Sequence, residues 1–416
     1  MAKTIIFTDE YVHQHANVSI LLQLVDLDIV REEYDEDSNT INLYCTHRWK
    51  VGVCPNCGQL CDQIHDYPHE REIHDCPIRG CHVKFIFNSV RLKCHKCETK
   101  FILPVRDVVP NCTYTYRLAK EIADPTRKQD VATLARIYNI GYKIVESILL
   151  KAAEGKLEER ANNPIDVRYI GIDEISNKKG YGGYVLVLTD IERRILLDIL
   201  PDRTKATLRE WLKNPPKGIN LVGLREAAID LWWHYKDTVK EVYPNIRIVA
   251  DRYHVTCNLH EVIHEERRKV QKNATTEEER KNLKGLRYIL LKNKSKLTEA
   301  ERKRLEKLKE THPKLYKLWL LRQELHDFYE KRMSPRAAKK FLNTWIRKAK
   351  KLNLTSLHKF CKTLKNWKKE IVNFFASRTT SGFVEGMNSK IRLLKRIAFG
   401  LPNFNHFRLR MLWACG

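Results

Sequence analysis

The stretch Tyr169-Ile170-Gly171-Ile172-Asp173-Glu174 is a short apolar run that ends on a carboxylate. Two further apolar runs follow at residues 185–188 and 195–197, and Gly180, Gly182 and Gly183 lie between the first two runs. This pattern predicts three consecutive strands with a glycine-containing turn. A buried strand that carries an acid at its end can present a ligand to a metal ion. An isolated Asp often only caps a turn, so the meaning of Asp173 depends on the rest of the chain.

Charge and composition narrow the class of partner. The 416 residues include 76 Lys and Arg against 51 Asp and Glu, a formal net charge of +25. Residues 261–378 alone carry 34 Lys or Arg and 14 Asp or Glu. Such an excess indicates a polyanionic partner, usually nucleic acid. No apolar run is long enough to span a membrane and the N-terminus lacks the pattern of a signal peptide, so we expect a cytoplasmic protein.

Two CxxC pairs predict a structural metal site. Cys54 and Cys57 form the first pair, Cys94 and Cys97 form the second, and 36 residues lie between them. Two such loops supply the four thiolates that Zn²⁺ prefers, and twelve cysteines without an export signal favour thiols or metal ligands over disulfides. Residues 83–87, 90–92 and 101–103 are the expected strands of this zinc ribbon. The nearby cysteines Cys61, Cys76 and Cys81 have no assigned role. Cys76 and Cys81 could bind a second metal or be unbound thiols, and both alternatives are open.

The segments on either side of the ribbon have different patterns. Residues 17–30 are an apolar lead-in that fits a helix or a strand, and the acidic residues 31–37 predict a solvated hairpin or loop. After the ribbon, helices are expected at residues 116–123, 129–138 and 142–152, with a tight turn at Asn139-Ile140-Gly141. This is the order of a helix-turn-helix, although a small packing bundle has the same pattern. Residues 155–164 are polar and predict a linker.

The three strands around Asp173 are followed by a helix, a strand, a helix and a strand. Asp202 is expected to cap a helix at residues 204–212, and residues 221–229 form a strand that ends on Asp230. A helix at 231–242 precedes a strand at 246–250, which ends on Asp251 with His254 three residues later. This order is that of the ribonuclease-H-like fold, in which the first and fourth strands are neighbours and parallel.

A long basic segment follows His254. Its pattern predicts helices at residues 277–292, 299–310, 314–330, 337–350 and 357–375, with Trp319, Trp345 and Trp367 as core anchors. Residues 331–378 carry 15 Lys or Arg and a single acid, Glu370. Such a density favours a surface that follows DNA phosphates over a merely solvated face. The polar residues 377–382 then lead into a helix at 383–396 that bears Glu385.

Taken together, these motifs resemble the DDE transposases of bacterial insertion sequences, specifically the ISL-three family with its N-terminal zinc ribbon. The matching blocks are CPNCG, CHKC, the helix-turn-helix, YIGIDE, AIDLWWHY, YPNIRIVADRYHV and SGFVEGMNSKIRLLKRIAFGLPNFNHFRLR. The resemblance implies a multidomain α/β protein whose ribonuclease-H-like core is interrupted by an all-helical insertion. It also implies a divalent metal, Mg²⁺ or Mn²⁺, and a DNA transposition reaction. A nuclease of the same fold and a domesticated regulator without catalysis are the alternatives.

The choice of the second catalytic acid lies between two residues. Asp230 ends the strand expected beside the first one, so its carboxylate starts about 5 Å from that of Asp173. Asp251 ends the strand after that, so its carboxylate is expected about 10 Å from that of Asp173. Related transposases carry a Cys/Asp-x-x-His motif after the second catalytic Asp, and Asp251 with His254 matches that motif. We therefore assign Asp173, Asp230 and Glu385 to the metal, with Asp251 and His254 as a supporting pair. Asp230 as a plain helix cap is the alternative.

These interpretations predict how the chain divides into domains and which residues contact double-stranded DNA. The expected partners are terminal inverted repeats, target DNA and a second copy of the chain in a homodimer. The candidate DNA-binding residues are Lys143, Lys339, Lys340, Lys348, Lys350, Arg392, Lys395 and Arg396. The expected divisions are a lead-in at 1–44, a zinc ribbon at 45–110, a helix-turn-helix at 111–163, the first part of the core at 164–256, the insertion at 257–378 and the final helices at 379–416.

Overall fold

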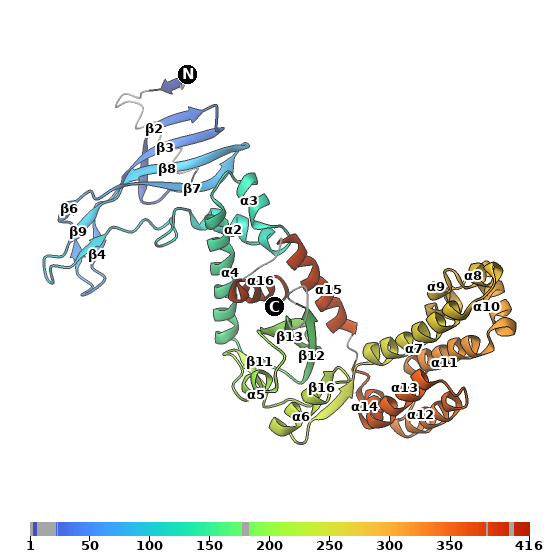
Figure 1. Cartoon of the computed structure of the whole chain (residues 1–416). Coiled ribbons are helices and arrows are strands. Elements are labelled where there is room, and N and C mark those ends of the chain that lie inside the picture. The colour runs from blue at the N-terminus through green and yellow to red at the C-terminus, as the bar shows by residue number, and fades with distance from the viewer. Residues whose placement is uncertain (1–2, 6–21, 23, 177–182, 380–381, 399–402) are drawn as a thin grey trace. The chain divides into compact units, whose positions relative to one another are not determined.

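The structure is a computed structural model that describes residues 3–5, 22, 24–176, 183–379, 382–398 and 403–416 (Figure 1). Within them the chain combines a β-rich N-terminal region, a mixed α/β core and a helical region near the C-terminus. It divides into two compact units, residues 1–156 with 394–414 and residues 157–393 with 415–416. The expected turn residues Gly180 and Gly182 lie outside the described residues.

The first unit contains a five-stranded sheet in the order β1-β2-β3-β8-β7, in which only β3 and β8 pair in parallel. The strands are β1 (Lys3–Ile5), β2 (Leu27–Asp35), β3 (Thr40–His47), β7 (Glu70–Ile78) and β8 (Cys81–Asn88). The expected hairpin is present, but most of its acidic stretch belongs to β2 itself. Cross-strand contacts accommodate these charges: Tyr44 donates to Glu33 at 2.9 Å, and Arg31 lies 3.7 Å above the Tyr44 ring.

Smaller sheets surround the paired cysteines. They consist of β4 (Gly52–Val53), β5 (Leu60–Cys61), β6 (Ile64–Asp66), β9 (Arg91–Lys93) and β10 (Lys100–Ile102). The ribbon strands expected near residues 90–92 and 101–103 are therefore confirmed as β9 and β10. The strand expected at 83–87 exists, but its assignment to the ribbon is wrong. It is part of β8, whose apolar side chains Val83, Phe85 and Phe87 fill the core of the larger sheet.

Three helices follow the sheets, α2 (Tyr116–Ala123), α3 (Val131–Ile137) and α4 (Tyr142–Asn162), with a 3₁₀ turn η1 (Pro125–Arg127) after α2. Asn139 has a φ of 49°, which confirms the tight turn between α3 and α4. The linker expected at 155–164 is wrong, because α4 continues through Asn162. The Lys, Glu and Arg residues of this stretch are good helix formers, and no proline occurs before Pro164. Helix α16 (Phe404–Cys415) packs on the same unit: the Trp413 indole donates to the Ala123 carbonyl at 3.1 Å.

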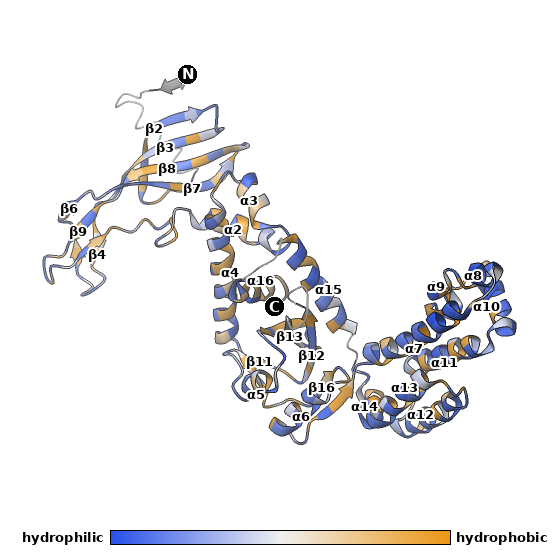
Figure 2. Cartoon of the chain, viewed as in Figure 1, coloured by the Kyte–Doolittle hydropathy of each residue, from blue (hydrophilic) through white to orange (hydrophobic). Residues whose placement is uncertain are grey.

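The second unit is built on a five-stranded sheet in the order β14-β13-β12-β16-β17. The strands are β12 (Tyr169–Ser176), β13 (Tyr184–Asp190), β14 (Ile195–Leu200), β16 (Glu226–Ile229) and β17 (Arg247–Ala250). Strands β12, β13 and β14 pair antiparallel, whereas β12, β16 and β17 pair in parallel. The prediction that the first and fourth strands are parallel neighbours is therefore confirmed. The buried apolar residues of these strands belong to one cluster that also includes residues of the surrounding helices, and Figure 2 shows apolar residues (orange) along β12 and β13.

The connections differ from the sequence prediction in detail. The expected strand at 221–229 is shorter, and the preceding β15 (Ile219–Asn220) pairs instead with β11 (Ile165–Asp166). Helix α5 (Lys205–Lys213) lies between β14 and β15, and α6 (Trp233–Val242) connects the parallel strands β16 and β17. The N-cap of α5 is Thr204, whose side chain accepts from the Thr207 amide. Asp202 was expected to be this N-cap. Instead, its carboxylate accepts a hydrogen bond from the amide of Thr204, the N-cap residue itself, at 2.8 Å.

A helical region follows β17. It comprises α7 (Arg252–Asn273), α8 (Glu277–Leu283), α9 (Leu286–Leu291), η2 (Lys294–Lys296), α10 (Glu299–Thr311), α11 (Pro313–Glu330), α12 (Pro335–Lys350), α13 (Thr355–Asn366) and α14 (Lys368–Ser377). Two expected helices are each divided in two. Gly285, with a φ of 75°, separates α8 from α9, and Trp367 separates α13 from α14. Trp319, Trp345 and Trp367 are buried, as predicted.

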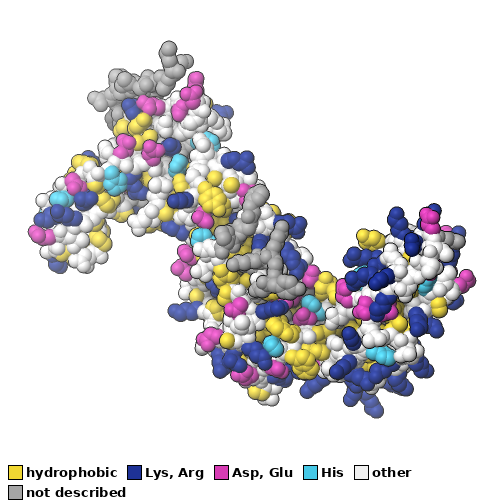
Figure 3. Space-filling view, viewed as in Figure 1, with side chains coloured by type: hydrophobic (Ala, Val, Ile, Leu, Met, Phe, Trp, Pro, Cys, Tyr) yellow, Lys and Arg dark blue, Asp and Glu magenta, His cyan; other side chains and the backbone are white. Residues whose placement is uncertain are grey.

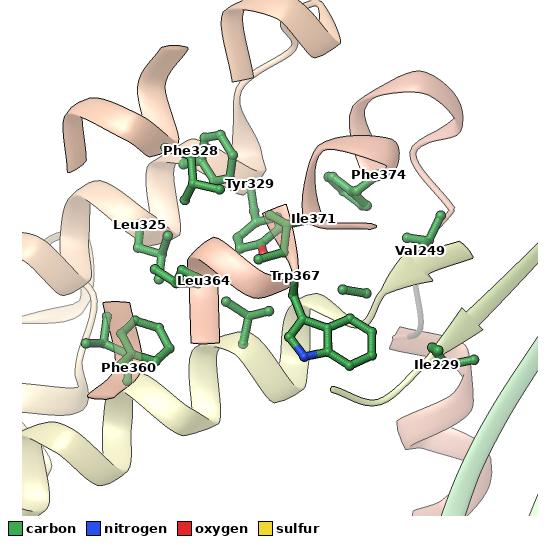
Figure 4. Packing of buried hydrophobic residues seen from close by; sticks show 14 of the residues in the cluster. Ile229, Val249, Leu325, Phe328, Tyr329, Phe360, Leu364, Trp367, Ile371 and Phe374 are labelled. Atoms are coloured by element: carbon green, nitrogen blue, oxygen red, sulfur yellow. The ribbon is translucent and has the colours of Figure 1, made fainter. Parts of the chain in front are cut away.

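The last helix of this region packs on the sheet. Trp367, Ile371 and Phe374 lie in the same apolar cluster as Val249 of β17 and Ile229 of β16 (Figure 4). Helix α15 (Gly382–Ile397) follows and crosses β12 closely. A Cβ atom added to Gly171 would lie 2.7 Å from a methyl carbon of Val384, so only a glycine fits on β12 at this approach.

Candidate active site

Strand register brings three aspartates to one edge of the sheet. Ile172 on β12 pairs with Ile229 on β16, and Ile229 pairs with Ala250 on β17. The next residue on each strand is an aspartate, so Asp173, Asp230 and Asp251 lie at the same level of three neighbouring parallel strands. The carboxyl ends of parallel strands are where an open α/β sheet places its ligands.

One histidine lies among the three carboxylates. The Nδ1 atom of His254 is 3.2 Å from Oδ1 of Asp230, and its Nε2 atom is 3.6 Å from Oδ1 of Asp173 and 3.7 Å from Oδ2 of Asp251. Because Oδ1 of Asp173 and Oδ2 of Asp251 both lie within 3.7 Å of the same nitrogen, the distance between these two oxygens is less than twice 3.7 Å. The separation of about 10 Å expected from strand spacing alone was too large, because both side chains lean towards the same ring.

Burial and the neighbouring charges both shift the pKa values of His254 and Asp230. Burial alone would lower the pKa of His254, but the contact with Asp173 and the charges of Asp230 and Asp251 raise it to about 9. Burial raises the pKa of Asp230, and the nearby charge of Asp173 adds to that effect, while His254 and the Leu231 amide counter it. Carboxylates this crowded require a positive partner, which is an imidazolium here and can equally be a metal cation.

The two candidates for the second acid have different local bonds. Asp251 is the N-cap of α7 and accepts a hydrogen bond from the Tyr253 amide at 2.7 Å. Asp230 accepts from the Leu231 amide and pairs with His254. Helix α6 begins at Trp233 with Trp232 as its N-cap, so Asp230 does not occupy the cap position of that helix. Asp251 thus carries a structural role that Asp230 lacks.

Glu174, the next residue on β12, belongs to a different cluster. Its carboxylate pairs with Arg203 at 2.6 Å and accepts a hydrogen bond from the Tyr235 hydroxyl at 2.8 Å. Side chains alternate across a strand, so Asp173 and Glu174 project from opposite faces of the sheet. The carboxylate group at the sheet edge therefore contains Asp173 without its neighbour.

Helix α15 supplies the remaining side of the site. The amide nitrogen of Asn388 donates to Oδ2 of Asp173 at 2.7 Å, across 215 positions of sequence. Glu385 lies one turn earlier on the same helix and pairs with Arg392 at 3.5 Å. It also lines a cavity of about 290 Å³ together with Tyr253 and other residues of α7 and α11. Within the described residues, Asn388 makes the hydrogen bond from α15 to Asp173, whereas Glu385 pairs with Arg392.

Asn388 was not predicted as a site residue from the sequence. The only available signal is its spacing from Glu385, since residues three positions apart share one face of a helix. An asparagine inside an otherwise basic helix has no distinguishing feature until the partner across the sheet is known. The expected site residues Asp173, Asp230, Asp251 and His254 are brought together.

The four cysteines of the two CxxC pairs converge. Their sulfur atoms all lie within 4.8 Å of one another, with 3.5 Å from Cys54 to Cys97 and 3.6 Å from Cys57 to Cys94. A tetrahedral zinc with Zn–S bonds of about 2.3 Å requires sulfur separations of about 3.8 Å. The donor set and its spacing therefore fit Zn²⁺.

The two cysteine loops have the same backbone. Cys54 donates its amide to the Gln59 carbonyl and Cys94 donates to that of Thr99, at 2.8 and 3.0 Å. The residue after each pair, Gly58 or Glu98, has a positive φ, 73° or 57°. Cys61 is buried beside the cluster, whereas Cys76 packs among the helices of the first unit. In the described part of the chain, these four cysteines are the only group of three or more Cys, His, Asp or Glu side chains whose ligand atoms all lie within 4.8 Å of one another.

The candidate DNA-binding residues are mostly exposed. Lys143 is exposed at the start of α4, and Lys339, Lys340, Lys348 and Lys350 are exposed on α12, although Lys348 pairs with Glu324 at 3.0 Å. On α15, Arg392 and Arg396 are exposed and Lys395 is half-buried. Figure 3 shows Lys and Arg side chains gathered over the helical region that contains α12.

Comparison with known proteins gives a consistent result. Residues 170–411 match the DDE transposase family of ISL3-type insertion sequences, described as "Transposase". The transposase of insertion sequence element IS1001 from Bordetella parapertussis is 26% identical over 388 residues, which cover 92% of this chain and 94% of that protein. The transposase of element IS1557 from Mycobacterium tuberculosis is 27% identical over 291 residues, 64% of each chain. No helix in the described residues is long and apolar enough to cross a membrane. The family match covers more than half of the sequence, and the chain belongs to the ISL3 family of DDE transposases, enzymes that catalyse DNA transposition.

Proposed function

We propose that Asp173, Asp230 and Glu385 are the carboxylates that hold the divalent metal of this transposase. The observation that carries the proposal is the register of β12 and β16, in which Ile172 and Ile229, the residues directly before Asp173 and Asp230, form the last parallel pair. Helix α15 bears Glu385 and lies against β12 at Gly171. We interpret the sheet order β14-β13-β12-β16-β17 as a ribonuclease-H-like core, and carboxylate oxygens are the ligands that Mg²⁺ and Mn²⁺ prefer.

The metal, when bound, would stabilise the charge on the attacking and leaving oxygens of a phosphodiester. The chain's own residues prepare the site. Asp173 and Asp230 supply negative charge at fixed positions, and His254 offsets their mutual repulsion in the free protein. Asp251 holds the first turn of α7, which carries His254. We therefore assign Asp251 and His254 a supporting role.

The same site can use either of two nucleophiles. Water would cut the element end and leave a 3′-hydroxyl, which would then attack target DNA in the same site. The second reaction distinguishes a transposase from a nuclease, so a strand-transfer assay follows joined products as well as cut ones. Joining two element ends favours a homodimer that binds terminal inverted repeats and target DNA.

The other parts of the chain are proposed to bind and position that DNA. The four-cysteine cluster is a structural Zn²⁺ site of Cys54, Cys57, Cys94 and Cys97, and α3 with α4 forms a helix-turn-helix in which Lys143 lies at the start of the second helix. The exposed lysines of α12 follow phosphates with little base reading. Arg392, Lys395 and Arg396 extend a basic face on α15. The bacterial nucleoid is the expected place of action, and the domain divisions given above remain our proposal.

The test compares Asp230→Asn with Asp251→Asn for Mg²⁺-dependent strand cleavage, while DNA binding is measured in parallel. Asparagine caps a helix about as well as aspartate, so Asp251→Asn keeps the start of α7. We expect Asp230→Asn to lose cleavage with DNA binding intact and Asp251→Asn to retain most of it. Asp237→Asn, on the exposed side of α6, is the matched control. Normal cleavage by Asp230→Asn together with an inactive Asp251→Asn would overturn the assignment.

A further inference from the structure

Asn388 is fully buried beside the proposed metal site. Its side-chain nitrogen donates to Oδ2 of Asp173 at 2.7 Å, and the residue has 0% of its surface exposed. Its side-chain oxygen, Oδ1, is also buried and has no hydrogen-bond partner in the described part of the chain. Buried polar atoms are normally paired, so an unpaired amide oxygen next to a carboxylate cluster needs an explanation.

The orientation of this amide follows from chemistry. An ionised carboxylate only accepts hydrogen bonds, so the NH₂ group of Asn388 must face Asp173 and the oxygen must face away from it. The other oxygen of Asp173, Oδ1, accepts from the Glu174 amide at 2.7 Å. Each oxygen of Asp173 thus accepts a hydrogen bond from a fixed donor and retains a lone pair for a metal.

The backbone keeps Asn388 in this place. Helix α15 approaches β12 where Gly171 has no side chain, and Val384 fills that contact with 2% of its surface exposed. Asn388 follows Val384 by four positions and Glu385 by three, so the three residues share one side of the helix. The contact at Gly171 therefore sets the position of both polar residues relative to Asp173.

We propose that Asn388 is a positioning residue of the metal site, which orients the Asp173 carboxylate through its nitrogen and would accept a hydrogen bond from a water on the metal through its oxygen. Mg²⁺ keeps several of its waters when it binds protein carboxylates, and such waters need acceptors. Groups that orient a ligand from behind typically change metal affinity or activity by about 10- to 100-fold when they are removed. This inference rests on the proposed function, because it requires Asp173 to bind the metal.

The test measures Mn²⁺ binding to the full-length protein without DNA, by isothermal titration calorimetry. The variants are Asn388→Leu and Asn388→Ala. Both remove the amide, but leucine keeps the branching of asparagine with a larger volume whereas alanine is smaller, so an effect that they share comes from the amide. Asn373→Leu is the matched control, since it removes a half-buried amide that donates to the Ile248 carbonyl at 2.8 Å, away from the carboxylates. Circular dichroism of the metal-free proteins reports whether each variant is folded.

We expect both Asn388 variants to bind Mn²⁺ about 10- to 100-fold more weakly, while the control binds it as the wild type does. Wild-type affinity in a folded Asn388→Leu or Asn388→Ala protein would overturn the proposal for Asn388. Asp173→Asn separates this failure from that of the proposed function. If the wild type and Asp173→Asn bind Mn²⁺ equally, the carboxylate site itself is wrong, whatever the Asn388 variants do.

Discussion

Replacing Gly171 with alanine tests whether the contact between β12 and α15 builds the active site. The added Cβ would lie 2.5 Å from the Thr189 hydroxyl oxygen and 2.7 Å from a methyl carbon of Val384. Carbon atoms normally approach to about 3.5–4.0 Å, so α15 must move by roughly 1 Å or β12 must deform. Overpacking of this kind costs about 1–3 kcal/mol in stability.

The larger effect is expected on catalysis. The displaced helix carries Glu385 and Asn388, and a misplacement of about 1 Å can reduce a rate by about 100-fold. We expect Gly171→Ala to slow Mg²⁺-dependent cleavage of an element-end duplex by about this factor. DNA binding, measured by fluorescence anisotropy, should stay near the wild-type value because the basic surfaces are unchanged.

Two companion variants make the reasoning refutable. Gly171→Ala/Val384→Ala removes one of the two clashes and should recover part of the lost rate, whereas Val384→Ala alone should be slightly impaired by the cavity that it leaves. Gly223→Ala is the matched control, since a Cβ there meets no atom within 4 Å. Full cleavage activity of Gly171→Ala, or no recovery in the double variant, would show that this contact does not position α15.

Three further outcomes follow from other parts of the chain. The purified protein should contain one zinc, and Cys94→Ser/Cys97→Ser should lose it together with the local fold, whereas zinc retention in that variant would contradict the site. Charge reversal at Lys339, Lys340 and Lys350 should weaken binding to all DNA sequences and lower the slope of log K against log salt by roughly 1 per lost phosphate contact; an unchanged slope would assign these lysines to a solvated face. Trp345→Ala removes a buried ring whose indole donates to the Leu321 carbonyl at 2.9 Å, and should lower the free energy of unfolding by about 3–5 kcal/mol in denaturant titration, so a change below about 1 kcal/mol would show that Trp345 is not a core anchor.

The sequence was informative where local rules decide the structure. Apolar runs that end on an acid predicted β12, β16 and β17, and hence the convergence of Asp173, Asp230 and Asp251. The spacing within each CxxC pair predicted the cysteine cluster, because a four-residue loop fixes the direction of both thiols. The start of α4 was also predicted, since Asn139 and Gly141 mark the turn before it.

Other features depend on contacts that local patterns do not encode. The polar residues after Ala152 continue α4 because each of them tolerates a helix, so polarity alone did not indicate a linker. The five-stranded sheet of the first unit was not predicted, because the parallel pairing of β3 with β8 joins segments about forty residues apart. The bond from Asn388 to Asp173 spans 215 positions, and its existence depends on how α15 packs against the sheet.

The end of the helical region is fixed to the strands that carry the candidate acids. Asn373 on α14 donates to the Ile248 carbonyl of β17 at 2.8 Å, and Ser377 donates to buried Glu226 at the start of β16, also at 2.8 Å. The other end of the region is α7, which begins directly after β17 with Asp251 as its cap. The helical region is therefore attached to these strands in two places: through Ser377 at the start of β16, and through α7 at the end of β17, where Asp251 lies. If the basic helices bind DNA as proposed, a force on them would be transmitted to these two strands, because close-packed interiors resist local deformation.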